Sequence, residues 1–122
     1  MLVIDPELSI ATCGQTLIPL STAQVRMLVA LARHAPLDGC ALSSAAELSL
    51  TALKAHLARL RERFAAAELA TPLAERNGRY VLTGEVWIAR RRLKNGRIVL
   101  ERARPDAEDR ALSPLSYRQT ST

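Results

Sequence analysis

Residues 49–64 are the part of the chain whose side-chain types and spacing could do chemistry. Apolar side chains recur there at i, i+3, i+7, i+10 and i+14, which predicts an α-helix with one buried stripe. That stripe consists of Leu50, Leu53, Leu57, Leu60 and Phe64. At about 100° per residue, the opposite face mixes small side chains with long hydrogen-bond donors. It carries Thr51, Ala52, Ala55, His56, Arg59, Glu62 and Arg63, with Lys54 and Arg61 at its border. Such a face could approach a polyanion closely and place its cations on phosphates and base edges.

A β-hairpin with arginines at its tip is predicted after this helix. Residues 73–76 and 79–82 favour strands around Asn77-Gly78, the strongest short signal for a hairpin. Arg76 and Arg79 flank that turn. We interpret both as contacts to an anionic partner, the alternative being that they only keep the hairpin tip soluble.

A second hairpin is predicted from residue 86 to residue 93, with a turn at 94–96 and a return strand over 97–100. Its cations include Arg90, Arg91, Arg92 and Lys94. Two interpretations remain open for them. They form a second phosphate-contacting element, or they make a charged edge strand that discourages aggregation.

The positive charge is concentrated in the second half of the chain. The whole sequence of 122 residues has a formal net charge of +5, but the segment 54–104 alone holds thirteen Lys and Arg against five Asp and Glu. This segment is interrupted by Gly, Asn and Pro and contains no long amphipathic helix for a membrane surface. Nucleic acid is therefore the expected partner.

Other classes of chemistry lack their residues. The sequence shows no nucleophile with a base and a carboxylate, no phosphate-binding loop and no acidic pair, so we expect no enzyme and no cofactor. Cys13 and Cys40 lack a CxxC pattern and histidines at ligand spacing, which predicts free thiols in a reducing cytosol and no metal. No apolar run approaches the roughly 20 residues of a membrane span, so a cytoplasmic, nucleoid-associated protein is expected.

Capping and turn signals predict the elements that position these residues. Ser21 and Gln24 form a capping-box pattern before a helix that extends to His34, where Pro36 and Gly39 end it. Strand-prone runs at residues 2–4, 8–11 and 16–20 predict a small antiparallel meander before that helix. A short second helix is expected over 43–48 with Ser43 or Ser44 as its cap, and Ser49 caps the third.

The predicted fold class is therefore α+β, with an N-terminal antiparallel meander, three helices, a C-terminal β-hairpin and a basic extension. We expect a main domain over residues 1–82, a basic β-hairpin extension over 83–102 and a partly ordered tail over 103–122.

Three stretches in this order resemble the effector domain of OmpR/PhoB-type response regulators. Residues 2–24 resemble its strand-rich start and the "L-T-x-x-E" beginning of its first helix. Residues 53–64 resemble its recognition helix, "V-D-V-H-I-x-R-L-R-x-K-L", and residues 73–82 resemble its wing, "I-x-T-V-R-G-x-G-Y-x-L", with the aromatic residue at Tyr80. The resemblance covers residues 2–82 and implies a winged helix-turn-helix without a receiver domain.

The resemblance implies roles for single residues. His56, Arg59 and Arg61 occupy DNA-contacting positions of the recognition helix, and Arg76 stands where the wing's arginine enters the minor groove. Lys54 replaces the usual Asp and adds positive charge. With only Ser49 between the second and third helices, the long loop that touches RNA polymerase is missing, which favours a repressor over an activator.

The sequence thus predicts a sequence-specific regulator that binds double-stranded DNA as a homodimer on repeated or palindromic half-sites, with the extension as the dimer contact. The predicted DNA-contacting residues are Thr51, Lys54, Ala55, His56, Arg59, Arg61, Arg63, Arg76, Arg79, Arg90, Arg91, Arg92 and Lys94. One alternative is a winged-helix adaptor or inhibitor that binds RNA polymerase or another host protein. A further alternative is an architectural protein that binds DNA without base preference.

Overall fold

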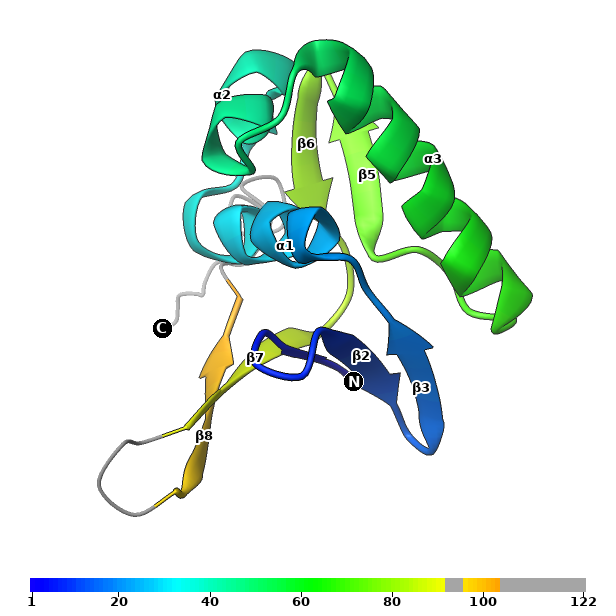
Figure 1. The fold of residues 1–122 in the computed structure, drawn as a ribbon, viewed down its shortest axis with the longest axis vertical. Helices are drawn as coiled ribbons and strands as arrows, with labels where there is room; N and C mark the ends of the chain where they lie inside the picture. Colours follow the sequence, from blue (N-terminus) through cyan, green and yellow to red (C-terminus); the bar gives the residue numbers. More distant parts are fainter. Residues whose placement is uncertain (92–95, 104–122) are drawn as a thin grey trace, which may run out of the picture.

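Three helices and two β-sheets make up the computed structural model, which describes residues 1–91 and 96–103 (Figure 1). The elements are β1 (Leu2–Asp5), β2 (Ile10–Cys13), β3 (Thr16–Pro19), α1 (Thr22–His34), β4 (Leu37–Asp38), α2 (Gly39–Ala45), α3 (Leu50–Ala66), β5 (Leu73–Arg76), β6 (Arg79–Leu82), β7 (Val86–Arg91) and β8 (Ile98–Arg102). The predicted α+β class is confirmed, with its N-terminal meander, three helices and C-terminal hairpin.

The larger sheet has five strands in the order β3-β2-β1-β7-β8. Its first three strands form the predicted antiparallel meander, and β7 joins β1 in parallel with Leu2 opposite Val86 and Ile4 opposite Ile88. Because β8 then returns antiparallel to β7, the sheet is mixed. The segment predicted as an extension, 83–102, therefore shares a sheet with the N-terminal strands.

The smaller sheet has three strands in the order β4-β6-β5. Its hairpin turns at Asn77 and Gly78, whose φ angles of 55° and 77° are the two positive values that a type I′ turn requires. The hairpin predicted from Asn-Gly is thus confirmed, and β4 adds Leu37 opposite Tyr80 at its side.

Helix α1 begins at the predicted capping box. The amide of Gln24 donates to Ser21 Oγ at 3.1 Å, and the amide of Ser21 donates to Gln24 Oε1 at 2.9 Å. The helix ends at His34, just before Pro36, as expected.

The predicted position of the second helix is wrong. Helix α2 spans Gly39–Ala45 instead of 43–48, because the Asp38 carboxylate accepts the Ala41 amide at 2.8 Å and starts the helix earlier. Ser43 is buried inside the helix, and its Oγ donates to the Cys40 carbonyl at 3.0 Å. The connection to α3 is consequently residues 46–49 and not Ser49 alone.

Helix α3 begins at Ser49 as predicted, with the Ala52 amide donating to Ser49 Oγ at 3.1 Å. Its buried residues are Leu53, Leu57, Leu60 and Phe64. The predicted stripe fails at Leu50, whose exposed fraction is 47%. Leu50 lies in the first turn beside the start of α2, where Gly39 offers no side chain to cover it.

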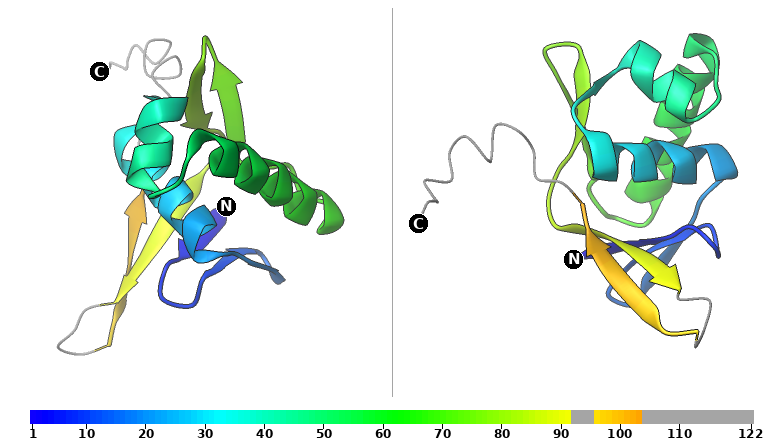
Figure 2. Two further views of the ribbon diagram at one scale, coloured as in Figure 1. Left: turned by 45° about the horizontal axis from the view of Figure 1, so that its top comes forward. Right: turned by 90° about the vertical axis from the view of Figure 1, so that its left-hand side faces the viewer.

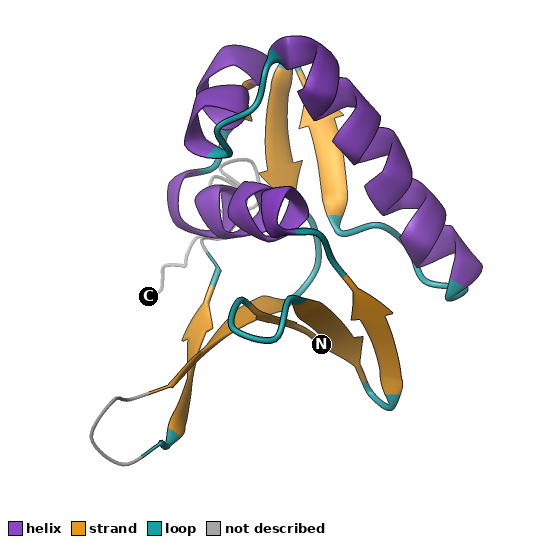
Figure 3. Cartoon of the chain, viewed as in Figure 1, coloured by secondary structure: helices purple, strands orange, loops and turns teal. Residues whose placement is uncertain are grey.

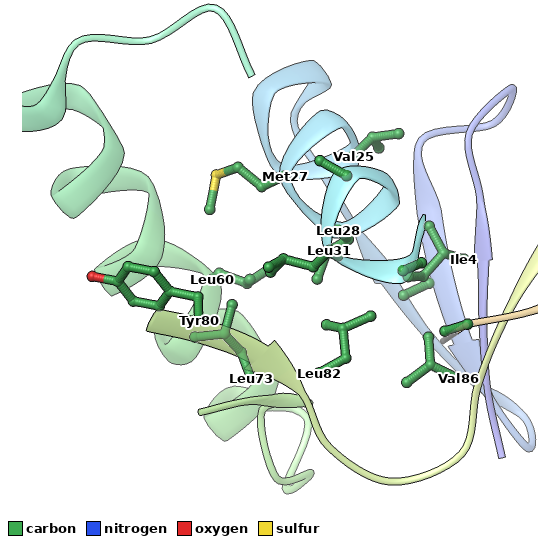
Figure 4. Packing of buried hydrophobic residues seen from close by; sticks show 14 of the residues in the cluster. Ile4, Val25, Met27, Leu28, Leu31, Leu60, Leu73, Tyr80, Leu82 and Val86 are labelled. Atoms are coloured by element: carbon green, nitrogen blue, oxygen red, sulfur yellow. The ribbon is translucent and has the colours of Figure 1, made fainter. Parts of the chain in front are cut away.

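The core is continuous from one sheet to the other through α1 (Figure 4). Met27, Leu28 and Leu31 of this helix are fully buried. Figure 4 shows them between Ile4 and Val86 of the five-stranded sheet and the residues of α3 and the smaller sheet. Figure 3 shows the three helices above the five-stranded sheet, with α1 nearest to it.

A bidentate ion pair joins the end of β1 to the end of β7. Arg91 Nη1 and Nη2 donate to Asp5 Oδ1 and Oδ2, each at 3.0 Å, and Asp5 Oδ1 also accepts the amides of Glu7 and Leu8. The hydrogen bonds from Arg91 lower the pKa of Asp5 below its usual value of 3.8, against the opposing effect of burial. The folded chain therefore favours the deprotonated form of Asp5 more strongly than the unfolded chain does.

Asp5→Asn should lower the free energy of unfolding at pH 7 by on the order of 1 kcal/mol, because Asn keeps the turn acceptor but loses the charge. A carboxyl group with a lowered pKa contributes stability above its unfolded pKa and loses it as the pH falls through the folded value. The difference between the two proteins in urea unfolding should therefore shrink below pH 3.8. Glu7→Gln, at the more exposed carboxylate 3.7 Å from Arg91, is the control and should have little effect. An equal difference at pH 7 and pH 2.5 would contradict this account.

Candidate nucleic-acid interface

The solvent-facing side of α3 has a central stripe of small side chains. Thr51 and Ala58 are exposed and Ala55 is half-buried. These three positions share one face at 100° per residue, while Arg59 projects from one side of it and Lys54 and Arg61 project from the other. All three cations are exposed. Ala58 was missed in the sequence, although the spacing 51, 55, 58 could have identified it.

These cations keep their charge for an outside partner. For Lys54, Arg59 and Arg61 no ion pair is found among residues 1–91 and 96–103. Glu62, which is also exposed, follows on the same face and limits the positive surface to residues 51–61 of the helix. A surface with small side chains at its centre and cations on both sides can bind a rod of negative charge.

The β5–β6 hairpin brings a further cation to the same end of the molecule. Figure 1 shows its tip at the end of the molecule where α3 begins, and Figure 2 shows the hairpin standing apart from that helix. Arg79 is exposed near the tip, opposite Asp38 in the β4–β6 pair. Arg76 is half-buried and already has an interaction within the chain.

Two predicted contact residues of α3 lie outside the stripe, of which Arg63 is exposed but hydrogen-bonded within the chain and His56 is half-buried. Arg63 Nη1 donates to the Pro19 carbonyl at 2.7 Å and to Gln24 Oε1 at 3.2 Å, so it ties α3 to the start of α1. His56 is half-buried, and its Nδ1 is buried without a hydrogen-bond partner in the described part of the chain. Neither side chain belongs to the outward stripe.

The cations of β7 are neutralised within the chain. Arg91 is held by Asp5, and Arg90 Nη1 lies 3.1 Å from Glu101 Oε1. Glu101 also accepts from Arg33, and the hydrogen bonds from Arg33 and Arg90 lower its pKa against the effect of burial. The predicted residues Arg92 and Lys94 lie outside the described residues.

Two other kinds of site were sought in residues 1–91 and 96–103. No group of three or more His, Cys, Asp or Glu side chains there could hold a metal ion. Cys13 and Cys40 are free thiols, the first half-buried and the second exposed. Across these ranges no helix has the length and apolar character needed to cross a membrane.

Comparison with protein-family models, with curated proteins and with solved structures found no match. The function of this surface must therefore be argued from its own geometry and charge.

Proposed function

We propose that this chain is a winged helix-turn-helix protein that binds double-stranded DNA in a sequence-specific way and regulates transcription. The observation that carries the proposal is the outward face of α3, on which Thr51, Ala55 and Ala58 lie between cations that have no ion pair within the described part of the chain. The fold is consistent with it. Helices α2 and α3 are joined by four residues, 46–49, and the three-stranded sheet β4-β6-β5 ends in a hairpin that can act as the wing.

In this proposal residues 51–61 of α3 lie along the major groove. The groove is about 12 Å wide, so a helix fits best where its facing side chains are small. Lys54 and Arg61 neutralise phosphates on one wall of the groove. Arg59, on the other side of the stripe, reads a base edge, for which guanine with its O6 and N7 acceptors is the preferred partner of arginine.

The hairpin tip contacts the DNA beside the helix. Arg79 is exposed and serves as a phosphate contact. The resemblance assigns the minor groove to Arg76, where a narrow A·T-rich groove attracts arginine. Since one α3 offers few base contacts, two copies on repeated or palindromic half-sites would supply the specificity. The short connection between α2 and α3 favours a repressor over an activator.

A second candidate function is a winged-helix adaptor that binds another protein. It is favoured by the ion pairs of Arg90 and Arg91 with carboxylates of the chain, which offset part of the positive charge available to DNA. An architectural protein without base preference is the third candidate.

Selection of binding sites from random DNA separates the three candidates. A base motif indicates a regulator, enrichment by DNA shape alone indicates an architectural protein, and no enrichment indicates an adaptor.

Salt dependence tests the electrostatic part of the proposal. With three phosphates neutralised per copy, by Lys54, Arg61 and Arg79, DNA affinity should fall about fortyfold per bound copy between 50 and 200 mM salt. Arg79→Gln should lower the slope of log K against log salt by about one, because one phosphate contact is lost. Weak DNA retention that hardly responds to salt would instead support the adaptor.

Base reading is tested at Arg59. Arg59→Ala should cost about 1–3 kcal/mol in DNA binding and relax the preference at one base position. Arg26→Ala is the matched control, since Arg26 is an exposed arginine on α1 paired only loosely with Glu47 at 3.7 Å. Titration of both variants on the selected site and on a scrambled site gives the two affinities. Equal losses for the two variants, or an unchanged Arg59→Ala, would contradict the docking of α3.

A further inference from the structure

Strand β8 is an unprotected edge of the five-stranded sheet. It is the last strand in the order β3-β2-β1-β7-β8, and none of the other described strands pairs with its outer side. Its first three residues are all large and aliphatic, with exposed fractions of 56% for Ile98, 39% for Val99 and 41% for Leu100. Edge strands of soluble proteins are usually short or protected by charge, proline or a bulge, so this run requires an explanation.

The opposite edge of the same sheet is protected. Strand β3 ends in Pro19, which has no amide hydrogen to donate, and Leu17 is its only large aliphatic side chain that is mainly exposed. The two edges therefore differ in their ability to pair with another strand.

We propose that β8 pairs with β8 of a second copy of this chain, in an antiparallel arrangement about a two-fold axis at Val99. A two-fold axis normal to the sheet continues each face of one copy into the same face of the other. Residue i then lies opposite residue 198 − i of the partner. Val99 meets Val99, Ile98 meets Leu100, and Arg97 meets Glu101.

The hydrogen-bonding pattern of β8 fits this pairing. The Ala103 amide donates to the Val86 carbonyl at 2.9 Å, so Ala103 directs its backbone groups toward β7. By the alternation of an antiparallel ladder, Val99 and Glu101 do the same, and Ile98 and Leu100 direct theirs to the open edge. In the proposed dimer Ile98 and Leu100 exchange backbone hydrogen bonds, and the two Val99 residues form a close pair without them.

Charge complementarity selects this register from its neighbours. Registers that keep the faces continuous differ by two residues along the strand. An axis at Ile98 would place Arg97 opposite Val99 and Leu100 opposite Gly96. An axis at Leu100 would place Val99 opposite Glu101 and Ile98 opposite Arg102. Only the axis at Val99 places every aliphatic residue of the run opposite another aliphatic residue. It also places Arg97 opposite Glu101, and symmetry gives this cation–anion pair twice.

This inference supplies the contact between the two copies that the proposed function calls for, but it is argued from β8 and tested without DNA. Sedimentation of the full chain from about 1 to about 100 µM should show a concentration-dependent dimer, because a contact of this size is expected to be weak. Val99→Lys should give a monomer by setting like charges face to face, while circular dichroism stays unchanged. Leu17→Lys is the matched control on the other edge and should still dimerise.

Cross-linking of single-cysteine variants tests the register of the proposed β8–β8 pairing. In a Cys13→Ala and Cys40→Ser background, Val99→Cys should form a disulfide-linked dimer on oxidation, since opposed residues of this kind have Cα atoms about 4.5 Å apart. Ile98→Cys and Leu100→Cys should link at least tenfold more slowly. Faster linkage at either of these two positions overturns the register.

A dimer that survives Val99→Lys overturns the assignment to β8. A full chain that stays monomeric over the whole concentration range overturns the proposal, whether the edge is open or covered by residues 104–122. If the dimer forms as described but DNA is not bound, the proposed function fails and this inference stands.

Discussion

The fold depends on the burial of α1 between two sheets. A helix with an apolar stripe on one side would cover one sheet, but α1 buries Met27, Leu28 and Leu31 completely, together with Ala30 and Ala32, and so contacts both. Burial of each large aliphatic side chain contributes about 1.5–3 kcal/mol, which makes this helix the main link between the two halves of the core. The polar group that it buries is satisfied in part by its neighbours, since Gln24 Oε1 accepts from Ser21 and from Arg63.

The orientation of α3 follows from the same contact. Its buried residues Leu57, Leu60 and Phe64 pack toward α1 and the smaller sheet, and Arg63 fixes its second half to Pro19 at 2.7 Å. The period of the helix then leaves Thr51, Ala55 and Ala58 facing solvent. The outward surface is therefore oriented by residues on the buried side of α3 and by the hydrogen bonds of Arg63.

Short-range sequence patterns made the starts of α1 and α3 and the β5–β6 turn predictable. The Ser21–Gln24 box, the Ser49 cap and the Asn77-Gly78 turn each involve residues within four positions of one another, so their physics is visible in the sequence. The predicted start of α2 was wrong because Asp38 and Ser43 are both good N-cap residues. Which of them caps the helix depends on the pairing of β4 with β6, which places Asp38. The parallel pairing of β1 with β7 and the role of Arg91, 86 residues from Asp5, are non-local and left no signal in a pattern of charges.

Charge counting does not reveal the partners that some cations have within the chain. Arg63, Arg90 and Arg91, all predicted as contacts, have hydrogen bonds or ion pairs that also contribute to the fold. Lys54, Arg59, Arg61 and Arg79 are exposed and have no ion pair among residues 1–91 and 96–103. Figure 2 shows the β5–β6 and β7–β8 hairpins pointing to opposite ends. The ion pairs of Arg90 with Glu101 and of Arg91 with Asp5 thus offset part of the positive charge at the end that carries β8. Because like charges would repel two copies there, this partial neutralisation favours contact between copies at that end.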